Sequence, residues 1–379
     1  MEEKRVFPFI ATATFNLEGF VKRELLSLGF ADAKAEQGGV RFSGTLEDAF
    51  RAALRLACAD RVLLLMAEGV CTSFEDLYQL AFRAPWQHLI PRDGAVPVTG
   101  HCARSRLMSV RDCQSIVKKA VADKLSAQYR LVRLPENGSR YKVDVSLHRD
   151  LARLTVDLCG DALNRRGYRT WNGEAPLRET LAAAMVRFSG WDCSLPLVDP
   201  TCGTGTLLVE AAFLQSGRAP GLTRPFDVEK WQKADAKTLS RIRAEAKAAF
   251  DPEKIRGISG SDISEEALRL ARQHIRQAGL ENRVTVSNRD LRAVTLPSPA
   301  VFLSNPPYGE RMSDRAACEK LYREYRPLLL RNPGSALTVI TNHSGFERVA
   351  SLRADRRIRL YNGRLECELL HFPPISSKE

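Results

Sequence analysis

The run Asp199-Pro200-Thr201-Cys202-Gly203-Thr204-Gly205 decides the fold class of this chain. It follows a short apolar segment, residues 195–198, and precedes a helix-forming segment, residues 207–212, so the order is strand, glycine turn, helix. Glycine allows positive φ and a close approach of the backbone to a ligand. The run lacks the third glycine of a dinucleotide fingerprint and the Gly-Lys-Ser/Thr of a triphosphate loop. It therefore predicts an α/β fold whose turn holds another kind of ligand.

A second motif, Asn305-Pro306-Pro307-Tyr308, follows the apolar run 300–304, which reads as a buried strand. Two prolines remove ladder donors and fix φ, so the strand ends where a parallel sheet usually binds its ligand. Asn305 Oδ1 and the Pro306 carbonyl can accept the two N–H bonds of an exocyclic amine, and Tyr308 can stack on the ring that carries it. The alternative interpretation is a strand-ending turn with a packed tyrosine.

Together the two motifs resemble the class I S-adenosylmethionine-dependent methyltransferases that modify amino groups. The resemblance implies S-adenosyl-L-methionine as cofactor, a Rossmann-like sheet finished by an antiparallel hairpin, and catalysis by the tetrad 305–308. Tyr308 is one of the aromatic residues that the motif permits.

The resemblance also implies a set of cofactor contacts. The turn around the methionine moiety would use Asp199, Gly203 and Gly205, with Cys202 adjoining it. Asp262 would bind the ribose hydroxyls, and Asp290 would face the adenine amine. Alternative interpretations are that Cys202 is a small packing residue or a thiolate for carbon methylation, that Asp262 caps a helix near Ser264, and that Asp290 is a solvated loop acid.

The distance along the chain from the glycine turn to Asp262 far exceeds the spacing of about 20 residues in a compact nucleotide-binding fold. The excess is a helical insertion around Trp231 and residues 241–250. Such an insertion resembles one branch of the family, the THUMP-domain RNA methyltransferases, as do the segments 166–169, 175–181 and 304–311. The most similar group is the bacterial 23S rRNA guanine-N2 methyltransferases, where the match is to the N-terminal half of the two-enzyme versions.

The expected domains are a ferredoxin-like α+β unit at 1–66, a THUMP domain at 67–160, a linker at 161–175 and the methyltransferase domain at 176–379. Apolar periodicity supports the first of these through a β-α-β-α-β order. At the other end of the chain, Asn362-Gly363 predicts a hairpin turn.

The net charge of +12 suggests a polyanionic partner, and residues 61–175 carry +6 of it. A helix expected from Ser109 to Gln128 has a basic outer face. From it and the residues before it we predict the RNA contacts Arg104, Arg106, Lys118 and Lys119. The alternative is a solvated helix face. We expect structured RNA, 23S rRNA by the resemblance, as the partner, and no obligate protein partner.

The composition points away from several classes of protein. No apolar stretch approaches 18 residues and no signal peptide opens the sequence, so a cytoplasmic, soluble protein without membrane contact is expected. Nine cysteines without a C-x-x-C pair indicate neither a metal site nor a disulfide framework.

Other functions share these motifs. The same tetrad serves adenine-N6 and cytosine-N4 methylation of DNA and methylation of a protein glutamine. Guanine-N2 methylation of tRNA is the main rival, because THUMP modules also occur in tRNA enzymes. A non-catalytic RNA-binding assembly factor is the remaining alternative.

Overall fold

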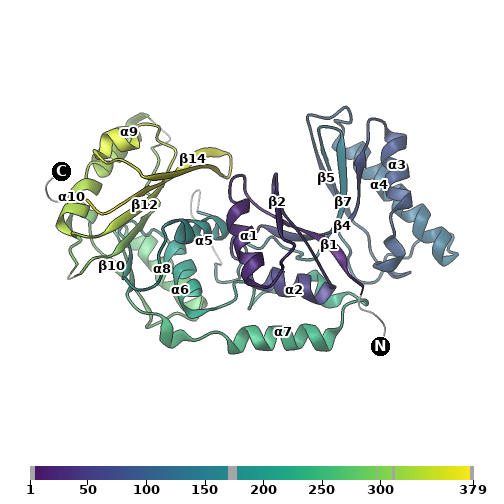
Figure 1. Cartoon of the computed structure of the whole chain (residues 1–379), viewed down its shortest axis with the longest axis horizontal. Helices are drawn as coiled ribbons and strands as arrows, with labels where there is room; N and C mark the ends of the chain where they lie inside the picture. The colour runs from purple at the N-terminus through teal and green to yellow at the C-terminus, as the bar shows by residue number, and fades with distance from the viewer. Residues whose placement is uncertain (1–4, 170–176, 297, 310–311, 376–379) are drawn as a thin grey trace. The chain divides into compact units, whose positions relative to one another are not determined.

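A computed structural model describes residues 5–169, 177–296, 298–309 and 312–375 (Figure 1). Residues 170–176, where the linker and its boundary with the methyltransferase domain are expected, lie outside the described residues, as do Glu310 and Arg311. The chain divides into two compact units. The first unit contains residues 1–12, 22–163 and 224–244, and the second contains residues 13–21, 164–223 and 245–379.

The first unit is built on one continuous sheet with the order β2-β3-β1-β4-β7-β6-β5. Its strands are β1 (Phe7–Thr12), β2 (Lys34–Glu36), β3 (Gly39–Gly44), β4 (Arg61–Val70), β5 (Val98–Ala103), β6 (Val143–His148) and β7 (Leu151–Asp157). Strand β4 pairs with β1 through its first half and with β7 over most of its length. The expected ferredoxin-like and THUMP strands therefore share a sheet, because β4 pairs with β1 on one side and with β7 on the other.

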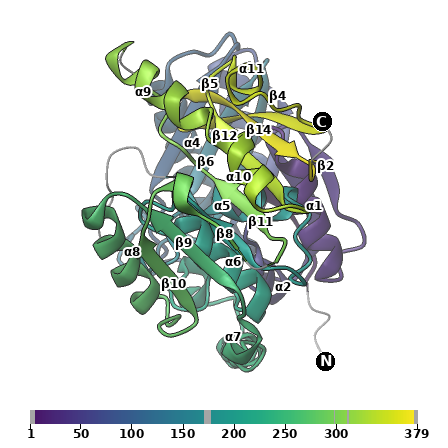
Figure 2. The same ribbon diagram turned by 90° about the vertical axis from the view of Figure 1, so that its left-hand side faces the viewer.

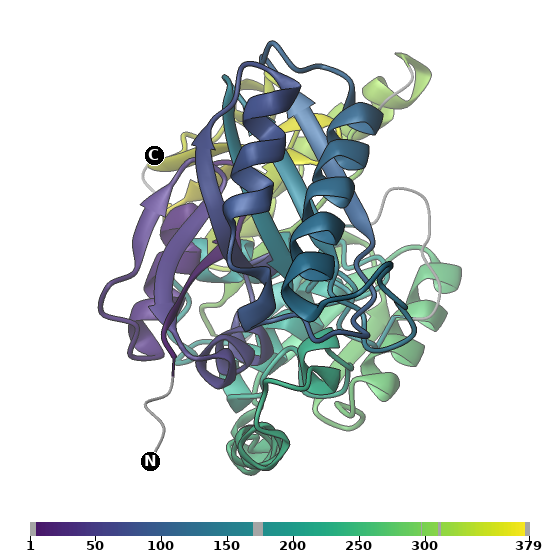
Figure 3. The same ribbon diagram turned by 90° about the vertical axis from the view of Figure 1, so that its right-hand side faces the viewer.

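The helices of the first unit are α1 (Glu18–Ser27), which the unit division crosses, α2 (Leu46–Arg55), α3 (Phe74–Arg83) and α4 (Val110–Tyr129), with a 3-10 turn η1 (Trp86–His88) between the last two. Three of them, α2, α3 and α4, begin at side-chain caps, which are Thr45, Ser73 and Ser109. Thr45 and Ser73 form capping boxes with Asp48 and Asp76, as helix starts of this kind require. Figure 3 shows α3 and α4 side by side over the sheet.

The second unit has a sheet with the order β10-β9-β8-β11-β12-β14-β13 (Figure 2). Its strands are β8 (Leu197–Asp199), β9 (Ile258–Asp262), β10 (Val284–Asn288), β11 (Val301–Ser304), β12 (Ala336–Thr341), β13 (Arg356–Asn362) and β14 (Leu365–Phe372). All neighbours are parallel except β14, which is antiparallel to β12 and to β13. The predicted terminal hairpin is confirmed, with Gly363 at φ +66° in its turn.

Helices cover both faces of this sheet. They are α5 (Glu179–Phe188), α6 (Thr206–Ser216), α8 (Glu265–Gln277), α9 (Met312–Tyr322), α10 (Tyr325–Arg331) and α11 (Phe346–Ala350), with 3-10 turns η3 (Pro252–Lys254) and η4 (Leu291–Ala293). Turn η2 (Asp227–Lys230) and most of helix α7 (Ala236–Ala248) belong to the first unit. Helices α5, α6 and α8 pack against β8, β9, β10 and β12. Helices α9, α10 and α11 form a separate core with β11, β12 and β14, centred on Phe302, Tyr325 and Phe346.

Residues 224–244, here called the inserted segment, lie between α6 and β9 in sequence but belong to the first unit. The Trp231 ring stacks on Tyr141 with a centroid distance of 5.0 Å, and its Nε1 donates to the Arg140 carbonyl at 2.9 Å. Phe226 packs edge-to-face on Phe50 at 5.4 Å. The predicted helical insertion thus supplies buried aromatic side chains to the first unit.

Candidate active site

The site lies at the carboxyl ends of β8 and β11, the two strands at which the order of the second sheet reverses. Ligands of open α/β sheets bind at such a switch point. A cavity of about 870 Å³ opens there. Its lining residues come from the turns after four strands and from α9: Pro200, Thr201, Gly203, Asp262, Ile263, Asp290, Leu291, Arg292, Asn305, Pro307, Ala317, Cys318, Lys320, Leu321, Arg323 and Glu324.

The glycine turn is tied to the end of the neighbouring strand by one carboxylate. The Gly203 N–H donates to Asp262 Oδ2 at 2.9 Å, and the Ser264 N–H donates to Asp262 Oδ1 at 2.9 Å. Gly203 has φ +51°, a conformation that glycine adopts without strain. Asp262 therefore lines the cavity, holds the turn and supports the start of α8 at once, so its two interpretations are compatible.

Three of the expected cofactor residues, Asp199, Cys202 and Gly205, belong to the glycine turn but do not line the cavity. Asp199 is 1% exposed, and its Oδ1 accepts the Thr201 N–H at 3.0 Å. Burial, reinforced by the charge of Asp262, raises the pKa of the Asp199 carboxyl to about 8. Cys202 is buried, and burial raises the pKa of its thiol, which disfavours the thiolate interpretation. Gly205 begins α6 at φ +80°.

One wall of the cavity combines two apolar residues, the exposed Ile263 and the buried Leu291, with a carboxylate. Ile263 directly follows Asp262, and 73% of it is exposed, which is unusual for isoleucine at a strand end. Leu291 lies beside Asp290 in the same lining. These apolar residues were missed from the sequence, although an isoleucine directly after a strand-ending aspartate could have indicated a shelf for a planar ring.

Asp290 lines the cavity but is engaged by its neighbour. The Arg292 backbone N–H donates to Oδ1 at 2.8 Å, and the guanidinium donates to both oxygens, at 2.9 and 2.6 Å. These hydrogen bonds lower the pKa of Asp290 to about 2. The Asp290 carboxylate, which was expected to face the adenine amine, is therefore already paired with the Arg292 guanidinium. This ion pair was not predicted from the sequence.

The tetrad lies at the cavity with two of its residues in the wall, Asn305 and Pro307. The Tyr308 hydroxyl donates to Asn305 Oδ1 at 2.7 Å, and the Tyr322 hydroxyl donates to the Pro307 carbonyl at 2.6 Å. Pro306 is buried, and Tyr308 is not among the lining residues. Stacking of Tyr308 on a base stays a prediction. The hydrogen bond from its hydroxyl to Asn305 was not expected from the sequence.

A buried chain of hydroxyl groups joins the two strand ends. The Thr201 and Ser304 hydroxyls are hydrogen-bonded at 2.6 Å, and Ser304 is also hydrogen-bonded to the Tyr325 hydroxyl. Ser304 and Tyr325 have no exposed surface. The glycine turn and the tetrad are thus held at a fixed separation by residues that showed no pattern in the sequence.

The four residues expected to contact RNA all lie in the first unit, whereas the cavity residues belong to the second. Arg104, Arg106 and Lys119 are exposed. Lys118 is half-buried, and its ammonium forms an ion pair with Glu136 and donates to the Val96 carbonyl at 2.8 Å. The helical pattern predicted that the Lys118 side chain points freely into solvent, but it is held by Glu136 and Val96.

The described residues contain neither a metal-binding cluster nor a membrane-spanning helix. Within that part of the chain, no cluster of three or more histidine, cysteine, aspartate or glutamate side chains could hold a metal ion. No helix built from the same residues combines the length and the apolar character needed to cross a membrane.

Three family models match the chain in order. They are the RlmL ferredoxin-like domain at residues 8–63, the THUMP domain at 71–157 and the RMKL-like methyltransferase domain at 166–371. The "Putative RNA methyltransferase YpsC" of Bacillus subtilis is 34% identical over 371 residues, which cover 97% of this chain and 96% of that protein. "Ribosomal RNA large subunit methyltransferase K/L" of Syntrophotalea carbinolica is 34% identical over 96% of this chain but only 53% of its own length. The chain thus spans about half the length of the K/L relatives that it matches.

Solved structures agree over the whole chain. SMU.472, "a putative methyltransferase complexed with SAH", superposes with a TM-score of 0.93 at 35% identity and covers 99% of this chain and 100% of its own. A "predicted N6-adenine-specific DNA methylase" from Listeria monocytogenes gives a TM-score of 0.92 at 36% identity and covers 98% and 97%. With three family models matched in order and relatives above 30% identity along its length, the chain belongs to the RMKL-like methyltransferases, class I enzymes whose methyl donor is S-adenosylmethionine.

Proposed function

We propose that the protein transfers the methyl group of S-adenosylmethionine to the exocyclic N2 amine of a guanosine in 23S ribosomal RNA. The observation that carries the proposal is the place of Asn305. Its side-chain amide lies at the end of β11 in the wall of the same cavity as Gly203 and Asp262. An amine acceptor and a cofactor turn therefore meet at one switch point.

The cavity fits the cofactor in size and in the character of its walls. Its volume of about 870 Å³ falls within the range of about 300–1,000 Å³ for ligand pockets. Gly203 permits close backbone approach, Asp262 offers lone pairs for ribose hydroxyls, and the exposed Ile263 offers apolar surface for a planar ring. When bound, S-adenosylmethionine supplies a methyl group already activated on a sulfonium.

The remaining task of the protein is to position and polarise the amine. A guanine N2 amine is a weak nucleophile, because its lone pair delocalises into the ring. Asn305 Oδ1 and the Pro306 carbonyl accept its two hydrogens, which localises the lone pair and stabilises the positive charge that forms on nitrogen. The oxygen of Asn305 has a second lone pair, so it can accept from the amine while it still accepts from Tyr308.

The RNA part of the proposal is supported by the first unit. A THUMP model matches residues 71–157, and the exposed Arg104, Arg106 and Lys119 lie within that range. Cationic side chains of this kind neutralise phosphates. Relatives named ribosomal RNA large subunit methyltransferase K/L support 23S rRNA, which also implies action in the cytoplasm. A base in a helix is out of reach, so the guanosine is flipped from its stack.

One experiment tests the proposal. The full chain is incubated with radiolabelled S-adenosylmethionine and separated large-subunit rRNA, small-subunit rRNA and tRNA, all from cells that lack the enzyme. Each RNA is then digested to nucleosides, and the labelled nucleoside is identified by chromatography against standards. The Asn305→Ala variant serves as the inactive control.

Labelled N2-methylguanosine in large-subunit rRNA alone supports the proposal. The same nucleoside in tRNA would support guanine-N2 methylation but overturn 23S rRNA as the substrate. N6-methyladenosine in any fraction would overturn the base assignment, and no label in any RNA would overturn the proposed activity.

A further inference from the structure

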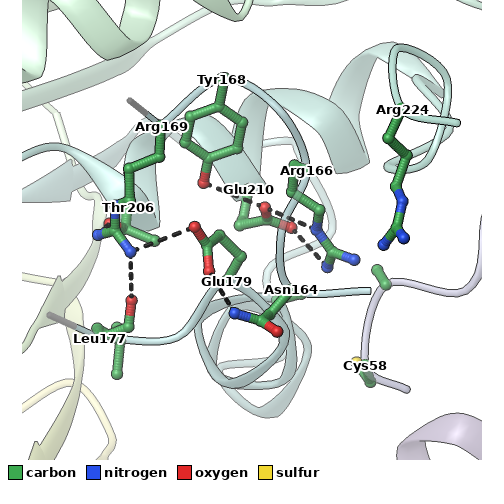
Figure 4. A network of polar contacts seen from close by, with 12 residues as sticks. Cys58, Asn164, Arg166, Tyr168, Arg169, Leu177, Glu179, Thr206, Glu210 and Arg224 are labelled. Carbon is green, nitrogen blue, oxygen red and sulfur yellow. Dashed lines mark hydrogen bonds and ion pairs between the residues drawn. The ribbon is translucent and has the colours of Figure 1, made fainter. Parts of the chain in front are cut away.

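A buried polar network connects the segment before α5 with the glycine turn, and Figure 4 shows its residues Arg166, Tyr168, Arg169, Glu179, Thr206 and Glu210, which all belong to the second unit. The Arg169 guanidinium donates to the Thr206 hydroxyl at 2.6 Å and to the Thr204 hydroxyl at 3.5 Å. Its other terminal nitrogen donates to Glu179 Oε1 at 3.2 Å and to the Leu177 carbonyl at 3.3 Å. One side chain thus joins two hydroxyls of the cofactor turn to the start of α5.

The network consists of two opposite charge pairs, and both are buried. The side chains of Arg169 and Glu179 are 8% and 4% exposed, and those of Arg166 and Glu210 are 2% and 1% exposed. The Tyr168 hydroxyl also donates to Glu210, at 3.3 Å. Desolvation of buried ion pairs offsets most of their attraction, so apolar residues of similar volume would stabilise a core equally well. The arrangement therefore contributes defined geometry more than stability.

The geometry acts on a turn that has no cap of its own. Gly205 is the N-cap residue of α6, and it offers no side chain to the first backbone N–H groups. Thr206 is the first helical residue and is 6% exposed. On the other side of the turn, His274 of α8 donates from Nδ1 to the Thr204 carbonyl at 3.1 Å. Arg169 and His274 thus hold Thr204 and Thr206 from two different elements.

We propose that Arg169 is a positioning residue for the cofactor: by holding the hydroxyls of Thr204 and Thr206, it keeps the glycine turn in its binding conformation. Without this contact, the turn samples other conformations and the binding-competent fraction falls. Apparent affinity falls by the same fraction. The inference rests on the proposed placement of the cofactor at Gly203 and Asp262.

The test is cofactor affinity in variants of Thr206. Thr206→Val keeps the shape of the side chain and removes the hydroxyl that Arg169 binds, whereas Thr206→Ser keeps the hydroxyl. Binding of S-adenosylhomocysteine to the full chain is measured by calorimetry, and the melting temperature is measured without ligand. We expect Thr206→Val to weaken binding roughly tenfold, as for a lost hydrogen bond to a charged group, and Thr206→Ser to bind within about twofold of the wild type.

Glu210→Gln is the matched control. Glu210 lies on the same helix as Thr206, and its substitution weakens the neighbouring Arg166–Glu210 ion pair, which is at least as buried as the Arg169–Glu179 pair, but leaves both turn hydroxyls untouched. We expect its melting temperature to fall and its affinity for S-adenosylhomocysteine to stay within about twofold of the wild type. Affinity losses that follow the melting temperature in all variants would overturn the positioning role.

A double-mutant cycle with Arg169→Met assigns the effect to the contact. If Arg169 acts mainly through Thr206, then Arg169→Met weakens binding in the wild-type background and has a clearly smaller effect in the Thr206→Val background, where only the 3.5 Å contact with Thr204 is left to lose. Fully additive losses would overturn the inference. A wild-type chain that binds no cofactor at all would instead refute the proposed function, so the two failures are distinguishable.

Discussion

The Tyr308 hydroxyl donates to the Asn305 side-chain oxygen at 2.7 Å, so the amide that we assign to catalysis is already held in place by the tetrad's own tyrosine. Tyr322 fixes the same tetrad at the Pro307 carbonyl. Groups that act on a transition state are most effective when they need no reorganisation during the reaction. The tetrad therefore has the rigidity that its proposed role requires.

Asn305→Ala should leave affinity for S-adenosylmethionine nearly unchanged and reduce turnover roughly a hundredfold or more, as when a preorganised polar group is lost. Calorimetry and single-turnover methyl transfer measure the two quantities separately. Wild-type turnover in this variant would show that the amide has no catalytic role.

The two parts of Tyr308 can be separated by substitution. Tyr308→Phe removes the hydroxyl bond to Asn305 and should reduce turnover about fivefold, the effect of a hydrogen bond worth about 1 kcal/mol. Tyr308→Ala also removes the ring, and a lost base stack of about 1–3 kcal/mol should reduce kcat/KM for RNA further. Equal losses in both variants, measured by steady-state kinetics, would contradict the stacking role.

Asp262→Ala should weaken cofactor binding by about 1–3 kcal/mol through lost hydrogen bonds. The Gly203 N–H also loses its acceptor, so part of the loss comes from the turn. Asp262→Asn is the matched variant, because one oxygen can serve only one of the two N–H donors well. We expect calorimetry to rank the affinities as wild type, then Asn, then Ala, and any other order would argue against a carboxylate contact.

The stability of the protein should depend on pH through Asp199. Burial raises the pKa of this carboxyl from 3.8 to about 8, so the folded state holds its proton more tightly than the unfolded chain. The stabilisation is present at low pH and is lost as the pH rises from about 4 through about 8. Asp199→Asn keeps an acceptor for the Thr201 N–H but does not titrate. From pH 6 to pH 9 the wild type should therefore lose melting temperature relative to the variant, and a constant difference would contradict the raised pKa.

The four basic residues predicted to contact RNA should not contribute equally to its binding. Each phosphate contact that is removed lowers the slope of log affinity against log salt by about one. We expect this reduction for Arg104→Ala, Arg106→Ala and Lys119→Ala. Lys118→Ala should give a smaller change, because Lys118 is paired with Glu136. Fluorescence anisotropy with an rRNA fragment at several salt concentrations measures the slopes, and four equal slopes would contradict this distinction.

The prediction from sequence succeeded where one local pattern determines the structure. Strand, glycine turn and helix appear in order at Asp199 to Ser216, and Asn362-Gly363 closes the terminal hairpin. The prediction failed for strands that form only because a neighbouring strand offers hydrogen bonds to them. Strand β2 is only three residues long, Lys34-Ala35-Glu36, and β5 contains Gly100 and His101, so neither gives the run of alternating apolar residues that predicts a strand.

The candidate site divides in the same way. Asn305 and Pro307 were found because a strand end followed by an amide and prolines is a local signal, and Asp262 was found through the family resemblance, supported by its place at the end of a strand. The Arg292 bond to Asp290 and the hydroxyl chain through Ser304 depend on side-chain directions and on strands far apart in sequence. The α9 wall of the cavity gave no signal, because nothing in its composition distinguishes a cavity wall from any other helix.

The inserted segment has a consequence for how the chain matures on the ribosome. Domains usually fold in order of synthesis, the N-terminal one first. Here Phe226 and Trp231 supply aromatic partners to Phe50 and Tyr141. The first unit thus keeps uncovered apolar surface until residues 224–244 have left the exit tunnel, by which time β8 and α6 of the second unit are already made. We expect the two units to finish folding together, so that no single cut in the sequence separates one complete unit from the other.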